Sequence, residues 1–129
     1  MRQKYILAVL VFSAAFTMGA KWADTPIESL ATIVGLWSGN GKTAEGYDYY
    51  ISYVFKEDGS IDYSQVVVFG GHKGQLRPDA VRVKGGKLVF EDYAGLLWTF
   101  TLQENKKGRR KLKGLREDGN RQLLKPGRY

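Results

Sequence analysis

The sequence predicts an all-β protein, a small antiparallel up-and-down barrel of about eight strands, with a β-sandwich as the alternative. From Val34 onward apolar and polar residues alternate, which is the period of strands that bury one face. Turn signals rich in glycine, aspartate and asparagine separate these runs, and no helix of useful length fits between them. Tight turns join antiparallel neighbours, and closing such strands into a barrel removes the exposed edges of the sheet.

Residues 1–20 have the order of a secretory signal peptide. Arg2 and Lys4 form a basic start, an apolar run follows from Tyr5 to Phe16, and small residues come next. The run is too short to span a bilayer, which needs ~20 residues. We therefore expect cleavage after Gly19 or Ala20, an exported protein that is periplasmic or secreted, and no transmembrane anchor in the mature chain. The chain has no cysteine, so we expect neither disulfides nor a lipid-modified cysteine.

The rest of the chain has the length of one domain, with residues 21–33 as a lead-in and residues 34–129 as the barrel domain. In the lead-in, residues 26–30 are expected to form one helical turn. Thr25 would be its N-cap and Pro26 would take the first helical position, where proline is favoured.

The predicted strands then follow in order. The clearest is 47–56, where the odd positions are aromatic or isoleucine and several even positions are polar. A hairpin turn at 57–60 leads into a strand at 61–69 that is rich in β-branched and aromatic residues. Further strands are expected at 80–84, 87–93, 96–103, 110–116 and 120–124, with turns at 85–86, 105–108 and 117–119. The glycine-rich segment 70–74 is expected to be a flexible loop.

The opening Gly35-x-Trp37 of this antiparallel chain resembles that of the calycin group, which comprises lipocalins, fatty-acid-binding proteins and avidins. The resemblance implies that the tryptophan closes one end of the barrel. It also implies that a basic residue from the last strands packs across the indole as a cation–π contact. Arg116 is the first candidate for that residue and Arg121 the second.

The longer form, which adds Gly39 and Gly41, is similar to the opening of the nitrobindin-like haem barrels. Those barrels use a histidine late in the chain as the iron ligand, whereas the single histidine here, His72, lies in the middle of the chain. We therefore expect no haem and no other cofactor. By default, Gly39, Gly41, Gly70 and Gly71 are read as turn glycines.

The aromatic residues of the strands form the candidate ligand site. An eight-stranded barrel is just wide enough to be filled by side chains or to hold one small ligand, so ordinary core packing is the alternative. The tyrosines favour a ligand, because buried hydroxyls need hydrogen-bond partners. The leading hypothesis is therefore non-catalytic binding of a small apolar or aromatic ligand inside the barrel, and its surface would comprise Tyr49, Tyr53, Tyr63, Phe90 and Trp98.

A basic cluster near the C-terminus supports a second hypothesis. The chain has a formal net charge of +7, and residues 104–129 hold ten lysines or arginines against three acidic residues. This cluster could dock on an anionic envelope component or an acidic protein. It lacks the interleaved aromatic residues that stack bases, which argues against nucleic acid. Its members are Lys106, Lys107, Arg109, Arg110, Lys111 and Lys113, with a solvated strand edge as the alternative reading.

The sequence offers no convincing catalytic or metal site. His72 has no second histidine or cysteine near it and is expected to be a surface loop residue. Glu91 and Asp92 are adjacent on a strand and so point to opposite faces. Asp92 is expected to be solvated near a turn, with an inward, functional carboxylate as the alternative reading. No phosphate-cradling loop, Cys/His cluster or nucleophile elbow is present, so we expect no enzyme activity.

Overall fold

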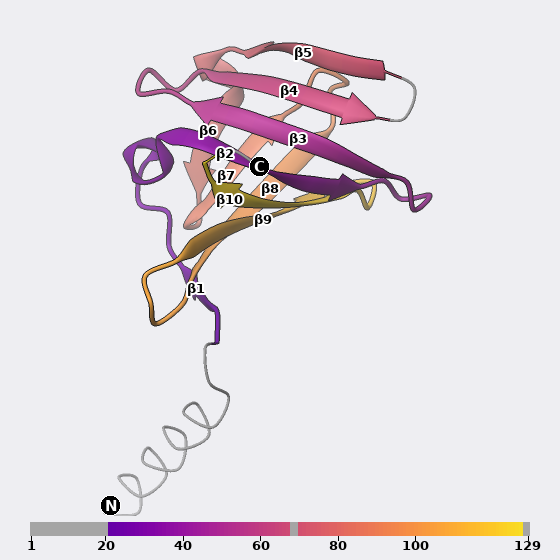
Figure 1. Ribbon diagram of the computed structural model, residues 1–129. Coiled ribbons are helices and arrows are strands. Elements are labelled where there is room, and N and C mark those ends of the chain that lie inside the picture. The colour runs from indigo at the N-terminus through magenta and orange to yellow at the C-terminus, as the bar shows by residue number, and fades with distance from the viewer. Residues whose placement is uncertain (1–20, 68–69, 128–129) are drawn as a thin grey trace, which may run out of the picture.

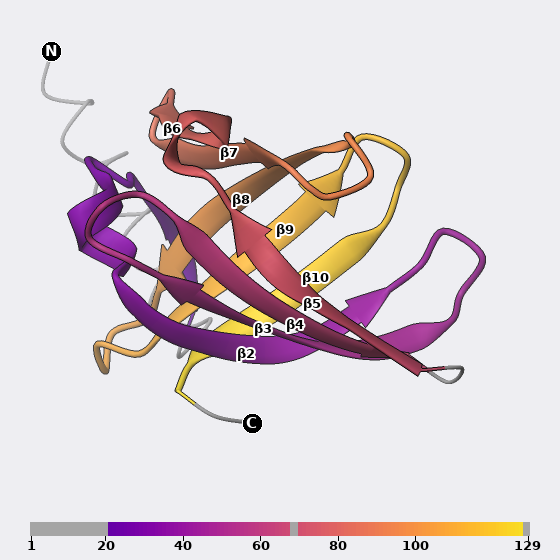
Figure 2. The ribbon, with the colours of Figure 1, turned by 90° about the horizontal axis from the view of Figure 1, so that it is seen from above.

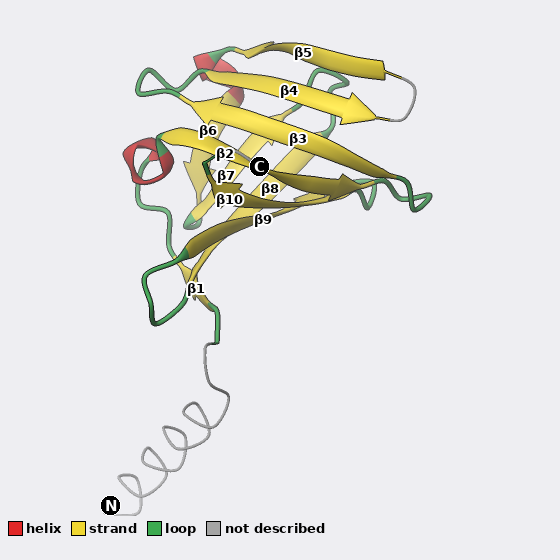
Figure 3. Ribbon diagram, in the orientation of Figure 1, coloured by secondary structure: helices red, strands yellow, loops and turns green. Residues whose placement is uncertain are grey.

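The computed structural model describes residues 21–67 and 70–127, and the predicted signal peptide lies outside them. Within this part the protein is all-β, with two short 3-10 helices (Figures 1 and 3). The helices are η1 (Leu30–Ile33) and η2 (Pro78–Ala80). The strands are β1 (Ala23–Thr25), β2 (Gly35–Lys42), β3 (Asp48–Phe55), β4 (Ile61–Val67), β5 (Gly70–Leu76), β6 (Val81–Lys84), β7 (Lys87–Glu91), β8 (Leu97–Glu104), β9 (Arg110–Arg116) and β10 (Arg121–Pro126).

The strands form one antiparallel sheet in the order β5-β4-β3-β2-β10-β9-β8-β7-β6, and β1 pairs separately with β8. The first long strand is therefore hydrogen-bonded to the last one, with Trp37 opposite Pro126 and Lys42 opposite Arg121. The sheet curls strongly into a half-barrel, so that β3–β5 lie over β9 and β10 (Figures 1 and 2). The two edge strands of the sheet, β5 and β6, follow one another in the sequence. The chain passes between them through η2, and the two strands are not hydrogen-bonded to each other.

The predicted all-β antiparallel meander is confirmed, and most predicted strands are present within a few residues. The described residues form ten strands where about eight were expected, and all ten belong to one sheet, as in the predicted barrel and unlike the alternative sandwich. The prediction of a loop at 70–74 was wrong, because this segment lies in β5 and pairs with β4 along its length. The two-residue turn at Gly85 and Gly86 is confirmed, and both residues have the positive φ that such hairpins require.

Glycines within strands leave room for aromatic rings on the neighbouring strand. Gly41 lies opposite Tyr49, and Gly114 lies opposite Phe100. A Cβ atom at Gly41 would be 2.0 Å from the Tyr49 ring, and one at Gly114 would be 2.3 Å from the Phe100 ring. The reading of Gly39, Gly41 and Gly71 as turn glycines is therefore corrected, because they lie inside β2 and β5. In a strand, a glycine marks a close approach of another group to the backbone.

The lead-in covers one end of the half-barrel. Residues 26–30 do not form the expected helical turn, since Thr25 ends β1 and the helical turn η1 comes later, at Leu30–Ile33. Ile27 and Ile33 are fully buried, and the backbone N–H of Ile27 donates to the carbonyl of Gly86. Trp37 lies beneath this segment and donates from Nε1 to the Ile33 carbonyl at 2.9 Å.

The basic residue over Trp37 is Arg110, not Arg116 or Arg121. The guanidinium carbon of Arg110 is 5.1 Å from the Trp37 ring centroid, and its Nη2 donates to the Thr32 carbonyl at 2.7 Å. Arg116 instead lies over Trp98, and Arg121 is exposed. Arg110 and Arg116 share the inner face of β9 but sit at opposite ends, roughly 20 Å apart at the rise of a strand. The cation–π contact implied by the resemblance is thus present with a different residue.

The inner face of the sheet carries an aromatic core. Phe100 is at its centre and packs against Trp98 and Phe90, each with ring centroids 5.5 Å apart. Tyr53 meets Phe90 and Phe100 edge-on, at 5.9 Å in both cases. These are the offset and edge-to-face geometries that aromatic pairs prefer. The core fills the end of the half-barrel near Trp37 and leaves space toward the other end.

Candidate functional site

A cavity of about 220 Å³ lies within the curl of the sheet. All five predicted ligand-site residues line it, so the structure brings together side chains from β3, β4, β7 and β8. Strand alternation explains why. Tyr53 on β3 faces Tyr63 on β4, and Phe90 on β7 faces Trp98 on β8, so each pair projects from one face of its ladder. Its other lining residues are Thr43, Ile51, Gln65, Leu76, Asp92, Tyr93, Arg116, Asn120 and Gln122.

Gln122 on β10 connects two of the tyrosines. The Tyr53 hydroxyl donates to Gln122 Oε1 at 2.7 Å, and Gln122 Nε2 donates to the Tyr49 hydroxyl oxygen at 3.0 Å. All three side chains are buried. Burial raises the pKa of the Tyr53 phenol far above its usual value and also raises the pKa of Tyr49. Both phenols therefore remain neutral hydrogen-bonding groups.

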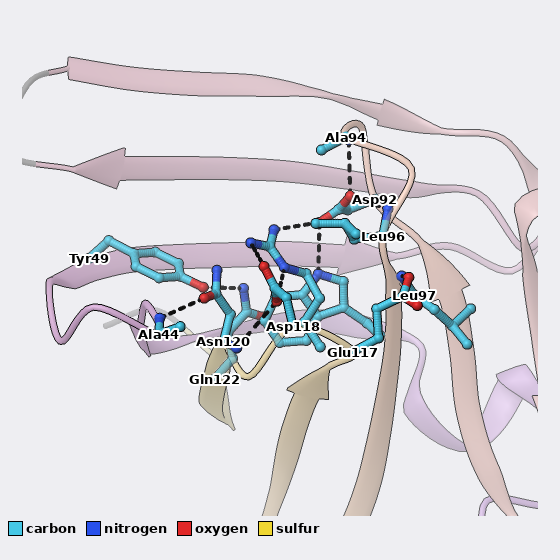
Figure 4. Close-up of polar contacts among 12 residues, drawn as sticks. Ala44, Tyr49, Asp92, Ala94, Leu96, Leu97, Glu117, Asp118, Asn120 and Gln122 are labelled. Carbon is cyan, nitrogen blue, oxygen red and sulfur yellow. Dashed lines mark hydrogen bonds and ion pairs between the residues drawn. The ribbon is translucent and has the colours of Figure 1, made fainter.

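Arg116 and Asp92 form an ion pair in the cavity wall, with Nη1 and Oδ2 2.9 Å apart and side chains only 17 % and 11 % exposed. Asp92 Oδ2 also accepts from Trp98 Nε1, while Oδ1 accepts from the backbone N–H groups of Ala94 and Leu96 (Figure 4). The expectation that Asp92 is solvated is therefore wrong. The carboxylate lies next to a turn, but the turn folds it inward as a hydrogen-bond acceptor.

Asp118 completes this charged group from the turn between β9 and β10. Its two carboxylate oxygens accept from Nε and Nη2 of Arg116, each at 2.8 Å. These hydrogen bonds hold the pKa of Asp118 below its usual range, and they are the largest contribution to the raised pKa of Arg116. Three nitrogens of the guanidinium are thus engaged by two carboxylates.

Three stacked rings lie between edge strand β5 and the turn after β7. The rings of His72 and Tyr93 are 4.1 Å apart, and Tyr63 stacks against both at 5.4 and 5.8 Å. The Tyr63 hydroxyl is 3.3 Å from His72 Nδ1. His72 is exposed as expected, although it lies on a strand and not in a loop. The stack connects the two sides of the half-barrel at the open edge of the sheet.

The predicted basic cluster is divided by strand alternation. Lys111 and Lys113 lie on the outer face of β9, whereas Arg110 points inward to Trp37. Lys106, Lys107 and Arg109 are exposed at the turn between β8 and β9. On the outer face, Lys111 Nζ lies 4.1 Å from the Trp22 ring centroid. Burial and then the nearby charges of Lys113 and Lys125 lower the pKa of Lys111.

Sequence reasoning missed Gln122, Arg116 and Asp92 as lining residues of the cavity. A signal for Gln122 was available, because it lies two residues before Leu124 and so shares the buried face of β10 with that residue. The inward turn of Asp92 had no such signal, since it depends on a neighbour in β9. Within residues 21–67 and 70–127, no group of three or more metal-ligating side chains gathers, and no helix is long and apolar enough to cross a membrane.

As arranged, the cavity can hold an aromatic ring against aromatic walls and orient it by hydrogen bonds. Compared with protein-family models, curated protein sequences and solved structures, the chain matches none of them significantly.

Proposed function

We propose that this protein binds one small, partly apolar, ring-bearing molecule in the cavity without converting it chemically. The observation that carries the proposal is the convergence of five aromatic side chains, from four strands, on one space that polar groups also face. Ligand sites combine apolar and aromatic walls with placed polar groups that orient the ligand, and both kinds of group line this cavity. Together with the predicted signal peptide, the proposal describes an exported carrier that resembles the calycin barrels.

The size of the cavity supports a single substituted ring. A cavity of roughly 150 Å³ lined by apolar side chains is large enough for benzene. The space here is about 220 Å³ and is bounded by Tyr49, Tyr53, Tyr63, Phe90 and Trp98. It therefore has room for one ring with a few additional heavy atoms and is too small for a long-chain lipid. A purely structural core would gain packing energy by filling such a space.

The first test is native mass spectrometry of the protein from its own source, followed by a thermal-shift screen of aromatic compounds. A bound ligand at 100 times its Kd should stabilise the fold by about 2.7 kcal/mol and raise Tm by roughly 10 °C or more. A stoichiometric extra mass that is lost on denaturation is the expected result. A clean apo mass together with no Tm shift across the screen would refute the proposal.

A matched pair of variants places the ligand. Gln65 lines the cavity from β4, and its neighbour Ser64 is exposed on the opposite face of the same strand. Gln65→Trp should fill the cavity and abolish the added mass and the Tm shift, whereas Ser64→Trp should preserve both. Equal retention of ligand by the two variants would show that it binds elsewhere.

A second candidate function is docking on an anionic envelope component or an acidic protein. It is favoured by the mutual proximity of Lys111, Lys113 and Lys125 on the outer face, none of which forms an ion pair within the described residues. Like charges held together lose stability unless an anion neutralises them. Binding to vesicles with anionic lipid should then fall steeply with added salt, and replacing all three lysines by glutamine should abolish it. Salt-independent binding would argue against this function.

A further inference from the structure

We propose that the Tyr49 hydroxyl is the hydrogen-bond donor that anchors the ligand, and that the ligand is an uncharged aromatic compound with an acceptor such as a carbonyl oxygen. This inference rests on the proposed function, since it assigns a ligand class to the same cavity. Three features of the cavity carry it: the direction of a hydrogen-bond chain, the persistence of the phenol proton and the pairing of the charges.

The hydrogen-bond chain has one direction. Tyr53 is buried in the core, and its proton has Gln122 Oε1 as its acceptor at 2.7 Å. Turning the Gln122 amide around would place Nε2 against Tyr53 and leave the Tyr53 proton without an acceptor, which is costly in a buried site. The amide is therefore held with Nε2 toward Tyr49, so Tyr49 Oη accepts at 3.0 Å.

This direction leaves the proton of Tyr49 uncommitted. Within the described residues, Gln122 is the hydrogen-bond partner of the Tyr49 hydroxyl, and it uses the oxygen of that hydroxyl as the acceptor. Tyr49 lines the cavity, so the free O–H can reach a bound molecule. Burial raises the pKa of the phenol, and the group therefore remains a donor at neutral pH.

The charges of the cavity wall are already paired. Asp92 and Arg116 are the charged residues among those that line it, and they bind each other at 2.9 Å. Arg116 is also engaged by Asp118, and both oxygens of Asp92 accept further hydrogen bonds. A charged ligand would lose its hydration without meeting a free countercharge, which is unfavourable. An uncharged ligand has no such cost.

The test uses two neutral probes of nearly the same shape, acetophenone and its hydrocarbon isostere α-methylstyrene, and benzoate as a charged probe. Affinities would be measured by NMR titration of the wild type, Tyr49→Phe and the control Tyr47→Phe, whose hydroxyl is on an exposed ring. In Tyr49→Phe, we expect the preference for the ketone over the hydrocarbon to fall about 5- to 150-fold, the range for an unpaired buried polar group. Tyr47→Phe should leave the preference unchanged, and benzoate should not bind.

The outcomes separate this inference from the proposed function. If both neutral probes bind and Tyr49→Phe leaves their ratio unchanged, the anchoring role is overturned while the carrier function stands. If benzoate binds as well as acetophenone, the uncharged class is overturned. If no probe binds to any variant, the inference is overturned, while the proposed function is decided separately by the mass-spectrometry and thermal-shift test. In the wild type, a ¹³Cζ shift of Tyr49 with acetophenone and not with α-methylstyrene would support the donor role without any substitution.

Discussion

Asp92→Asn should destabilise the fold strongly, although Asp92 follows the last residue of a strand and lies next to a turn. The substitution keeps the shape of the side chain and replaces one carboxylate oxygen by an amide N–H₂. One oxygen can still accept from the backbone N–H groups of Ala94 and Leu96. The new N–H₂ group would then face Trp98 Nε1 and Arg116 Nη1, which are both donors.

The expected loss follows from these two hydrogen bonds. A hydrogen bond to a charged group contributes about 1.5–3 kcal/mol. Breaking a fully buried ion pair costs about 3–5 kcal/mol. Arg116 keeps both bonds to Asp118 and is 17 % exposed, so the full figure does not apply. We therefore expect the free energy of unfolding to fall by about 2–4 kcal/mol, which is roughly 10–20 °C in Tm for a domain of this size.

The assay is urea unfolding followed by circular dichroism, with Glu91→Gln as the control. Glu91 is the exposed neighbour of Asp92, so Glu91→Gln should change the free energy of unfolding by less than about 0.5 kcal/mol. A double-mutant cycle with Arg116→Gln should give a coupling of at least about 1 kcal/mol, because the two side chains are in direct contact. If Asp92→Asn costs no more than Glu91→Gln, with an unchanged m value, the carboxylate is solvated and the reasoning fails.

Three further predictions follow from the structure. Gly114→Ala would place a Cβ 2.3 Å from the Phe100 ring and should cost about 1–3 kcal/mol in urea unfolding; a neutral effect would mean that the ring is not seated there. Arg110→Met removes the cation–π contact with Trp37 and the hydrogen bond to the Thr32 carbonyl. It should lower the free energy of unfolding by about 1–2 kcal/mol and shift Trp37 fluorescence, whereas the exposed control Arg109→Met should do neither. Burial raises the pKa of Tyr53 and Tyr49, so above pH ~10 the unfolded chain releases protons that the folded chain retains, and stability should be constant with respect to these groups below that pH and fall above it. Tyr53→Phe should reduce that alkaline fall, and an equal fall in this variant would contradict the assignment.

Much of the fold was predictable because its determinants are local. The alternation in 47–56 and 96–103 places side chains on two faces wherever the strand lies in the fold. Gly85 and Gly86 form a hairpin turn because glycine readily adopts the positive φ that the turn requires. Segment 70–74 was mispredicted for a related reason. Its glycines suggest a loop by local criteria, yet pairing with β4 supplies the backbone hydrogen bonds that make it a strand.

The candidate site was predictable only in part. The five aromatic residues could be proposed because they occupy the apolar positions of their strands, and such positions share the inner face of a curled sheet. The polar partners of these residues could not be assigned. Whether Asp92 is solvated or bonded depends on Arg116, which follows it by 24 positions, and the partner of Tyr53 lies 69 positions away.

The sequence by itself determined the all-β class, most of the strand limits and hairpin turns, and the aromatic face of the sheet. Each of these depends on a period of two residues or on the conformational range of a few turn residues. Tertiary structure alone decided that β2 pairs with β10, that the open edges are β5 and β6, and that Arg110 rather than Arg116 covers Trp37. The sequence cannot choose between the two arginines, because they have the same side chain and lie on the same face of β9. Only the curl and register of the sheet determine which end of β9 meets which tryptophan.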